Sequence, residues 1–188
     1  IKKFLNIGYM ISCLHEIYYD KKLIKTIYYT HSCNSYINKI NDLQNKISNK
    51  EINFCSFDSS DNTYFNNSYY GKLIDDDVKI TKNTYDLSYN MILTGPNAAG
   101  KTTLLKSTIF NIILSQQFGI GFYNDSNINI YDYIHCYINI PETSNRDSLF
   151  QAEARRCKNI INIIENNPTN KHFCVFDELY SGTNPNDA

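Results

Sequence analysis

Length, composition and charge already exclude several classes of protein. The chain has 188 residues, 42% of them apolar and 20% charged, which predicts one globular domain with a proper core. Its net charge of −1 argues against a basic face wide enough to hold nucleic acid by phosphate contacts alone. No window approaches the roughly 18 consecutive apolar residues of a membrane span. Because the chain starts at Ile1 rather than Met and shows no leader, we expect a fragment.

The six cysteines are scattered, with no CxxC pair and no histidine at zinc-ligand spacing. This pattern predicts reduced, buried thiols in an intracellular protein, either cytoplasmic or nuclear, rather than a metal site.

The first part of the chain is expected to be helical. Residues 1–19 and about 35–48 carry apolar side chains at helical spacing. Such stripes usually pack in a core, and the alternative is a helical arm that reaches towards other domains. Residues 53–70 are polar, rich in Asn and Ser and aperiodic, which predicts a loop. We therefore expect a helical lead-in and polar loop over 1–70 and a second domain over 71–188.

Strands and helices alternate in this second domain. VKITKNTYDL predicts a half-exposed strand pair, and residues 91–94 predict a short buried strand before a glycine. Further expected elements are helices over 102–117 and 148–166 and strands within 128–140 and over 172–176. This alternation predicts an α/β fold with a parallel, doubly wound sheet, flanked by helices and with ligand at the strand ends.

A phosphate-binding loop is predicted between residues 91–94 and the helix that follows. The pattern GxxxxGK(S/T) is matched without a mismatch by Gly95, Pro96, Asn97, Ala98, Ala99, Gly100, Lys101 and Thr102, and Thr103 comes next. The glycines let backbone N–H groups and the helix N-terminus converge on phosphate oxygens. Lys101 should reach the β- and γ-phosphates, and Thr102 should offer its hydroxyl to Mg²⁺. The alternative is a plain strand-to-helix turn.

The nucleotide base is expected to be adenine. NKIN at Asn38 lacks the Asp of a guanine-reading NKxD segment, so ATP is favoured over GTP.

The second motif is FCVFDELYSGT, an apolar strand that ends in two adjacent carboxylates. Downstream of a phosphate loop, Asp177 is the expected magnesium partner through a water molecule, and Glu178 is the expected general base. Without the loop, such a pair would be an ordinary solvated turn.

The third motif opens a helix. Ser148 and Gln151 form an S-x-x-Q capping box, which explains Ser148 without any ligand. The functional alternative is that this helix start faces a phosphate bound by another subunit.

In this order, the motifs resemble those of the ATPase domain of the MutS family of DNA mismatch-repair proteins. GPNAAGKTT resembles the family's GPN-x-x-GK-S/T loop, in which Asn97 lies near the γ-phosphate. DSLFQAE resembles its S-T-F-x-x-E segment, and DELYSGTNP its D-E-x-x-R-G-T segment. The matching positions of these two segments are Ser148, Phe150, Glu153, Asp177, Glu178, Gly182 and Thr183.

The resemblance implies an ABC-like P-loop NTPase fold and a Mg-ATP site shared by two subunits. Ser148 would complete the site of the partner in a homo- or heterodimer. Hydrolysis would drive clamp movement on DNA, which other parts of the protein would hold, and no membrane is implied. The alternatives are another ABC-class ATPase, such as an SMC-like or transporter subunit, or a module that binds ATP without hydrolysis. Ser181 in place of the usual Arg, Leu149 in place of Thr and the Ala98-Ala99 pair indicate a divergent branch.

Overall fold

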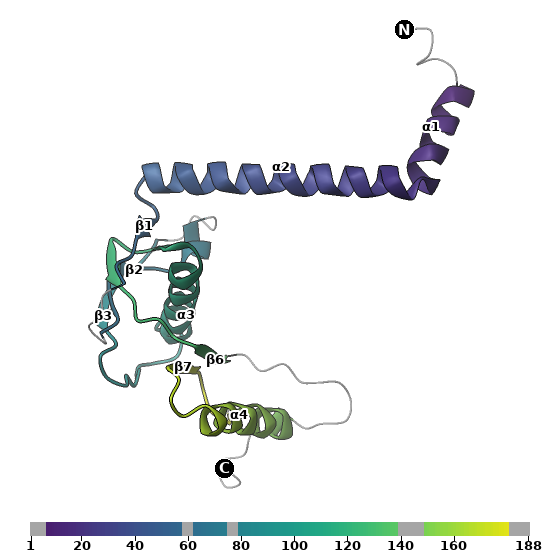
Figure 1. Ribbon diagram of the computed structural model, residues 1–188. Helices are drawn as coiled ribbons and strands as arrows, with labels where there is room; N and C mark the ends of the chain where they lie inside the picture. The colour runs from purple at the N-terminus through teal and green to yellow at the C-terminus, as the bar shows by residue number, and fades with distance from the viewer. Residues whose placement is uncertain (1–6, 58–61, 75–78, 139–148, 181–188) are drawn as a thin grey trace. The chain divides into compact units, whose positions relative to one another are not determined.

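The computed structural model describes residues 7–57, 62–74, 79–138 and 149–180 of the chain (Figure 1). The chain divides into two compact units, Ile1–Asn49 and Lys50–Ala188. Each unit is described by itself. None of the helices in the described ranges is both long and apolar enough to cross a membrane.

The first unit consists of two helices, α1 (Ile7–Tyr19) and the long α2 (Lys21–Ser48). Asp20 begins α2, because its carboxylate accepts hydrogen bonds from two backbone N–H groups of the first turn at 2.8 and 3.3 Å. The helical predictions are confirmed, although α2 begins well before residue 35. Within the described residues neither helix has a buried side chain, so the prediction that their apolar stripes pack in a core is wrong here.

The second unit contains an antiparallel sheet in the order β3-β2-β5 and a short antiparallel pair of β1 with β4. The bounds are β1 Asn53–Phe54, β2 Tyr64–Ser68, β3 Asn83–Asp86, β4 Ile120–Gly121 and β5 Asp125–Asn127, and the 3₁₀-helix η1 spans Gly71–Ile74. Phe65 lies opposite Tyr85 on one side and Ser126 on the other. The prediction of a loop is therefore wrong for residues 53–54 and 64–68, where long-range pairing satisfies the polar backbone, and residues 58–61 lie outside the described residues.

The helix α3 (Lys101–Phe118) confirms the helix expected after the phosphate loop. Its buried face is largely polar and consists of Ser107, Thr108, Asn111, Ile112 and Ser115. The hydroxyl groups of Thr108 and Tyr85 are 2.8 Å apart, and the Asn111 side-chain oxygen accepts a 2.9 Å hydrogen bond from the backbone of Phe122. Hydrogen bonds thus hold α3 in place as much as apolar contacts do. The neighbouring apolar core is Phe65, Ile112, Tyr123 and Ile128.

The carboxy-terminal part is a strand, a helix and a strand, as predicted. β6 (Tyr133–Tyr137) and β7 (His172–Phe176) are parallel, and α4 (Leu149–Asn166) lies between them in the chain. The Arg156 guanidinium of α4 donates a 3.0 Å hydrogen bond to the carbonyl oxygen of Cys136 in β6. The backbone N–H of Asp177 bonds the Tyr137 carbonyl at 2.8 Å, which carries the ladder one residue past β7.

One predicted strand is absent. Residues 91–94 form no strand, and the side chains of Met91 and Ile92 are 41% and 88% exposed. A strand requires a neighbour that accepts and donates its backbone hydrogen bonds, and no described strand lies beside this segment. β6 and β7 are the one parallel pair among the described strands, and a wider doubly wound sheet stays a prediction.

All six cysteines are free thiols, as predicted. None of them is fully buried, which differs from the expectation.

Candidate functional site

The phosphate loop ends where α3 begins, and its backbone takes a conformation that suits anion binding. Gly100 is the N-terminal cap of α3 and has a φ of 90°, in the left-handed region that glycine tolerates. No side chain caps the helix, so none competes for its first N–H groups. Ala98 also has a positive φ, 62°, which is unfavourable for a residue with a Cβ atom. The loop therefore keeps a costly conformation that presents a helix N-terminus.

Lys101 lies over this loop. Its ammonium group donates hydrogen bonds to the carbonyl oxygens of Gly95, at 2.7 Å, and Pro96, at 2.9 Å. The side chain thus returns to the first turn of the loop and places a positive charge beside the N-terminus of α3.

Thr102 and Asp177 connect the loop with the acidic motif. The Thr102 hydroxyl donates a 2.7 Å hydrogen bond to a carboxylate oxygen of Asp177, which is 75 positions further along the chain. Since the hydroxyl is the donor of this hydrogen bond, the lone pairs of the Thr102 oxygen remain available to a cation. Two hard oxygen donors next to a phosphate-binding loop fit Mg²⁺. The structure therefore brings together the two residues that the sequence assigned to the metal.

A cavity of about 250 Å³ gathers most of the predicted site. It is lined by Asn97, Ala98, Gly100, Lys101, Thr102, Thr103 and Glu178. Glu178 therefore faces the same space as the phosphate loop, although it comes from the other end of the domain. Its backbone φ is 45°, again in the left-handed region. Gly95, Pro96 and Ala99 belong to the loop without lining this cavity.

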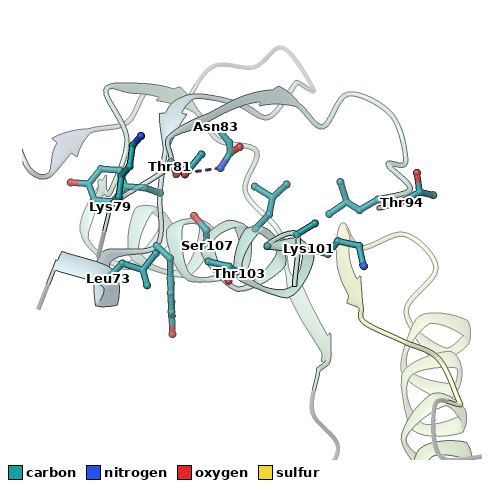
Figure 2. A pocket seen from close by; sticks show the side chains of 14 residues that line it. Leu73, Lys79, Thr81, Asn83, Thr94, Lys101, Thr103 and Ser107 are labelled. Atoms are coloured by element: carbon teal, nitrogen blue, oxygen red, sulfur yellow. Dashed lines mark hydrogen bonds between the residues drawn. The ribbon is translucent and has the colours of Figure 1, made fainter. Parts of the chain in front are cut away.

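A second cavity, of about 330 Å³, adjoins the loop and was not anticipated from the sequence (Figure 2). Figure 2 shows Lys79, Thr81 and Asn83 on one side and Thr103 and Ser107 of α3 on the other. In an extended segment alternate side chains point to the same face, so the sequence could have predicted that residues 79, 81 and 83 share one face. No sequence motif assigns these three residues to a binding cavity. Ala99, Gly100 and Lys101 complete the side nearest the loop.

Ser148 lies outside the described residues, as do Ser181, Gly182 and Thr183. The helix that follows Ser148 is described from Leu149 onwards. The role of Ser148 in a partner's site stays a prediction.

Comparison with known proteins assigns the family. The model of MutS domain V matches residues 91–188, which is more than half of the chain. An endonuclease MutS2 from Finegoldia magna is 34% identical over 101 residues, or 53% of this chain and 13% of the relative. The DNA mismatch repair protein MSH3 from Debaryomyces hansenii is 30% identical over 125 residues, or 63% of this chain and 11% of the relative.

A DNA mismatch repair protein MutS from Borrelia turicatae is similar as well, at 32% identity over 112 residues, 57% of this chain and 13% of the relative. The chain therefore spans only about a tenth to an eighth of the length of these three relatives. The match begins at Met91 and includes the phosphate loop, α3, α4 and the acidic motif. The chain belongs to the MutS family.

Proposed function

We propose that this chain is the Mg-ATP-binding and ATP-hydrolysing domain of a MutS-like DNA mismatch-repair or DNA-binding protein, with an ABC-like P-loop fold. The observation that carries the proposal is the hydrogen bond between Thr102 and Asp177. It joins the end of the phosphate loop to the acidic motif, with Glu178 on the wall of the same cavity. Neither motif alone would define a hydrolytic site, because hydrolysis needs the phosphate and the base in one place.

The loop side would hold the triphosphate. Lys101 would exchange its bonds to the Gly95 and Pro96 carbonyls for bonds to phosphate oxygens, which are stronger acceptors for an ammonium group. The uncapped N-terminus of α3 would add backbone N–H groups and a favourable helix dipole. Asn97, which lines the cavity, would lie near the γ-phosphate.

The acidic side would carry the chemistry. Thr102 would bind magnesium directly and Asp177 through water, and the ion would neutralise charge on the phosphate oxygens. Glu178 would take a proton from the attacking water. The oxygen of this water would bond to the γ-phosphorus while the bond between the γ-phosphorus and the ADP oxygen breaks. The products would be ADP and inorganic phosphate.

The adenosine end of the nucleotide would occupy the 330 Å³ cavity. This cavity shares Gly100, Lys101 and Thr103 with the phosphate cavity, so one ligand can extend from one to the other. Its walls combine leucine side chains with polar groups such as Asn83, the mixture typical of a small-molecule site.

The assembly and the DNA role rest on the family. A MutS-like dimer, identical or mixed, would place Ser148 of one subunit at the nucleotide of the other. DNA would be held by parts of the protein outside this chain, since a net charge of −1 supplies no broad basic face. Two of the named relatives are DNA mismatch repair proteins and one is an endonuclease, so the DNA substrate is left open.

The test compares ATP binding with phosphate release in the complete protein. Glu178→Gln should lower turnover by about 10²- to 10⁴-fold while Mg-ATP still binds, because only the proton acceptor is lost. Glu165→Gln, at an exposed position on α4, is the matched control and should leave turnover and Mg-ATP binding unchanged.

Turnover that stays unchanged in Glu178→Gln would overturn the assignment of the base. Magnesium-dependent ATP binding without turnover in the wild type would favour an assembly module that does not hydrolyse ATP. Absence of ATP binding in the wild type would overturn the proposed function altogether.

A further inference from the structure

The turn that follows β7 has an unfavourable backbone conformation. Glu178 and Tyr180 have φ values of 45° and 57°, and neither is a glycine. Residues with a Cβ atom rarely adopt this region, and they keep it only where surrounding contacts impose it. The contacts of this turn therefore decide where the Glu178 carboxylate lies.

Tyr180 makes contacts that could impose this conformation. Its ring packs on Phe150 of α4, with ring centroids 5.6 Å apart. Its backbone N–H lies 3.5 Å from the hydroxyl of Tyr137, at the end of β6. Its own hydroxyl is hydrogen-bonded to the thiol of Cys157, which raises the pKa of Tyr180. Two elements thus hold one residue of the turn.

The contacts on α4 come from one face of that helix. Phe150, Glu153 and Cys157 follow the spacing i, i+3 and i+7, which places them in one row. Glu153 is only 3% exposed, and its Oε2 has no hydrogen-bond partner among the described residues. Burial raises the pKa of Tyr137 and the hydrogen bond to Cys157 raises that of Tyr180, and the Glu153 carboxylate contributes to both shifts. Polar and aromatic groups of α4 therefore concentrate against the acidic turn.

We propose that Tyr180 is a positioning residue that holds Glu178 at the phosphate cavity by joining the acidic turn to α4 and β6. We call Tyr137, Phe150, Cys157 and Tyr180 the turn clamp. The role of the clamp in hydrolysis rests on the proposed function of Glu178. A shift of α4 would change the position of the base through the Phe150–Tyr180 contact. Since α4 follows Ser148, the clamp would also connect a subunit's own site with the element expected to serve its partner.

Three substitutions of Tyr180 distinguish the contribution of its ring from that of its backbone conformation. Tyr180→Ala and Tyr180→Gly should each lower kcat by about 10- to 100-fold, since small displacements of a catalytic group are costly. Their KM and Mg-ATP affinity should stay unchanged, because the clamp contacts described above join the turn to α4 and β6 and not to the phosphate loop. Tyr180→Phe keeps the ring on Phe150 and should retain most of kcat. Leu179→Ala, 53% exposed in the same turn, is the control.

The glycine variant is the decisive one. Glycine accepts a positive φ without strain, so the turn can still adopt its backbone conformation but has lost the ring that anchors it to α4. Wild-type kcat in Tyr180→Gly would overturn the proposal. An equal loss of kcat and of ATP affinity would also overturn it, because it would indicate general damage to the site.

A double-mutant cycle tests the link to α4. Phe150→Leu and Tyr180→Ala should be non-additive in kcat, since either one breaks the same contact. Full additivity would contradict the link.

Amide hydrogen exchange tests the turn clamp independently of the proposed function. In Tyr180→Ala the amides of residues 177–180 should exchange faster, as the turn loses its tertiary contacts, while the amides of α3 keep their protection. This readout needs no ATP hydrolysis. An inactive wild type would overturn the proposed function alone, whereas unchanged exchange in the turn would overturn the clamp.

Discussion

The two halves of the second unit differ in how completely their buried polar groups are paired. The α3 layer, consisting of α3 with β2, β3 and β5, pairs its buried side chains with one another. Asn111, 1% exposed, bonds the backbone of Phe122 in both directions, and Ser115 bonds the hydroxyl of Tyr123 at 2.9 Å. The α4 layer, consisting of α4 with β6 and β7, leaves Oε2 of Glu153 without a partner among the described residues.

This difference suggests a structural role for the α3 layer and a functional role for the α4 layer. A fully paired polar network specifies one arrangement and makes a rigid base, and this base carries the phosphate loop. Unpaired carboxylates and left-handed backbone are unfavourable and persist where other contacts hold them, often at functional sites. In the α4 layer Oε2 of Glu153 is unpaired within the described residues, and the turn that follows β7 has left-handed backbone at Glu178 and Tyr180. We expect substitutions in the two layers to have opposite effects on stability.

The largest effect on stability is expected in the α3 layer. Asn111→Leu removes the acceptor of the Phe122 N–H and leaves that half-buried group unpaired, which should lower the free energy of unfolding by about 1–3 kcal/mol. Chemical denaturation followed by circular dichroism measures it. Asn162→Leu, at an exposed position on α4, is the control. An Asn111→Leu protein as stable as the wild type would contradict the description of this layer.

A smaller effect, of opposite sign, is expected in the α4 layer. Glu153→Met replaces a buried carboxylate by an apolar side chain of similar length, which should leave the free energy of unfolding unchanged or raise it by about 1 kcal/mol. The same denaturation experiment applies. A loss comparable to that of Asn111→Leu would show that Glu153 is as well paired as Asn111 and would remove the contrast.

The smallest effect concerns pH. Burial, with contributions from His172 and Arg156, lowers the pKa of His135 below its usual 6.5. The carbonyl oxygen of Asn167 can only accept, so His172 Nε2 carries a proton, and in the neutral ring His172 Nδ1 accepts the 3.1 Å bond from His135 Nε2.

The unfolded chain therefore binds a proton at His135 more readily than the folded one. Stability should fall as the pH decreases below about 6.5, where the unfolded His135 becomes charged. Thermal midpoints between pH 7.5 and 5.5 should decrease for the wild type and decrease less for His135→Phe. Equal decreases in both proteins would contradict this origin.

Local patterns predicted the parts of the fold that depend on local sequence. The helix α3 and the strand β7 follow from a helical period and a short apolar run, and the structure has both of them. Thr102 and Asp177 were assigned to one metal from motif order, and a hydrogen bond joins them. The role of these residues at a nucleotide stays a prediction.

Long-range pairing explains the failures. Residues 64–68 look like part of a loop because their polar side chains reveal nothing of the strands that pair with them. Residues 91–94 look like a strand, but strand formation depends on a neighbour that periodicity cannot supply. Tyr180 was missed for the same reason, since its partners Phe150 and Tyr137 are distant in sequence.

The central claim is that the phosphate loop and the acidic turn form one hydrolytic site. Single-turnover hydrolysis of Mg-ATP by the complete protein, with Glu178→Gln beside the wild type, tests this claim most directly. We predict that both bind ATP to the same extent and that the bound nucleotide is cleaved about 10²- to 10⁴-fold more slowly in the variant. Cleavage at the wild-type rate in Glu178→Gln would contradict the account.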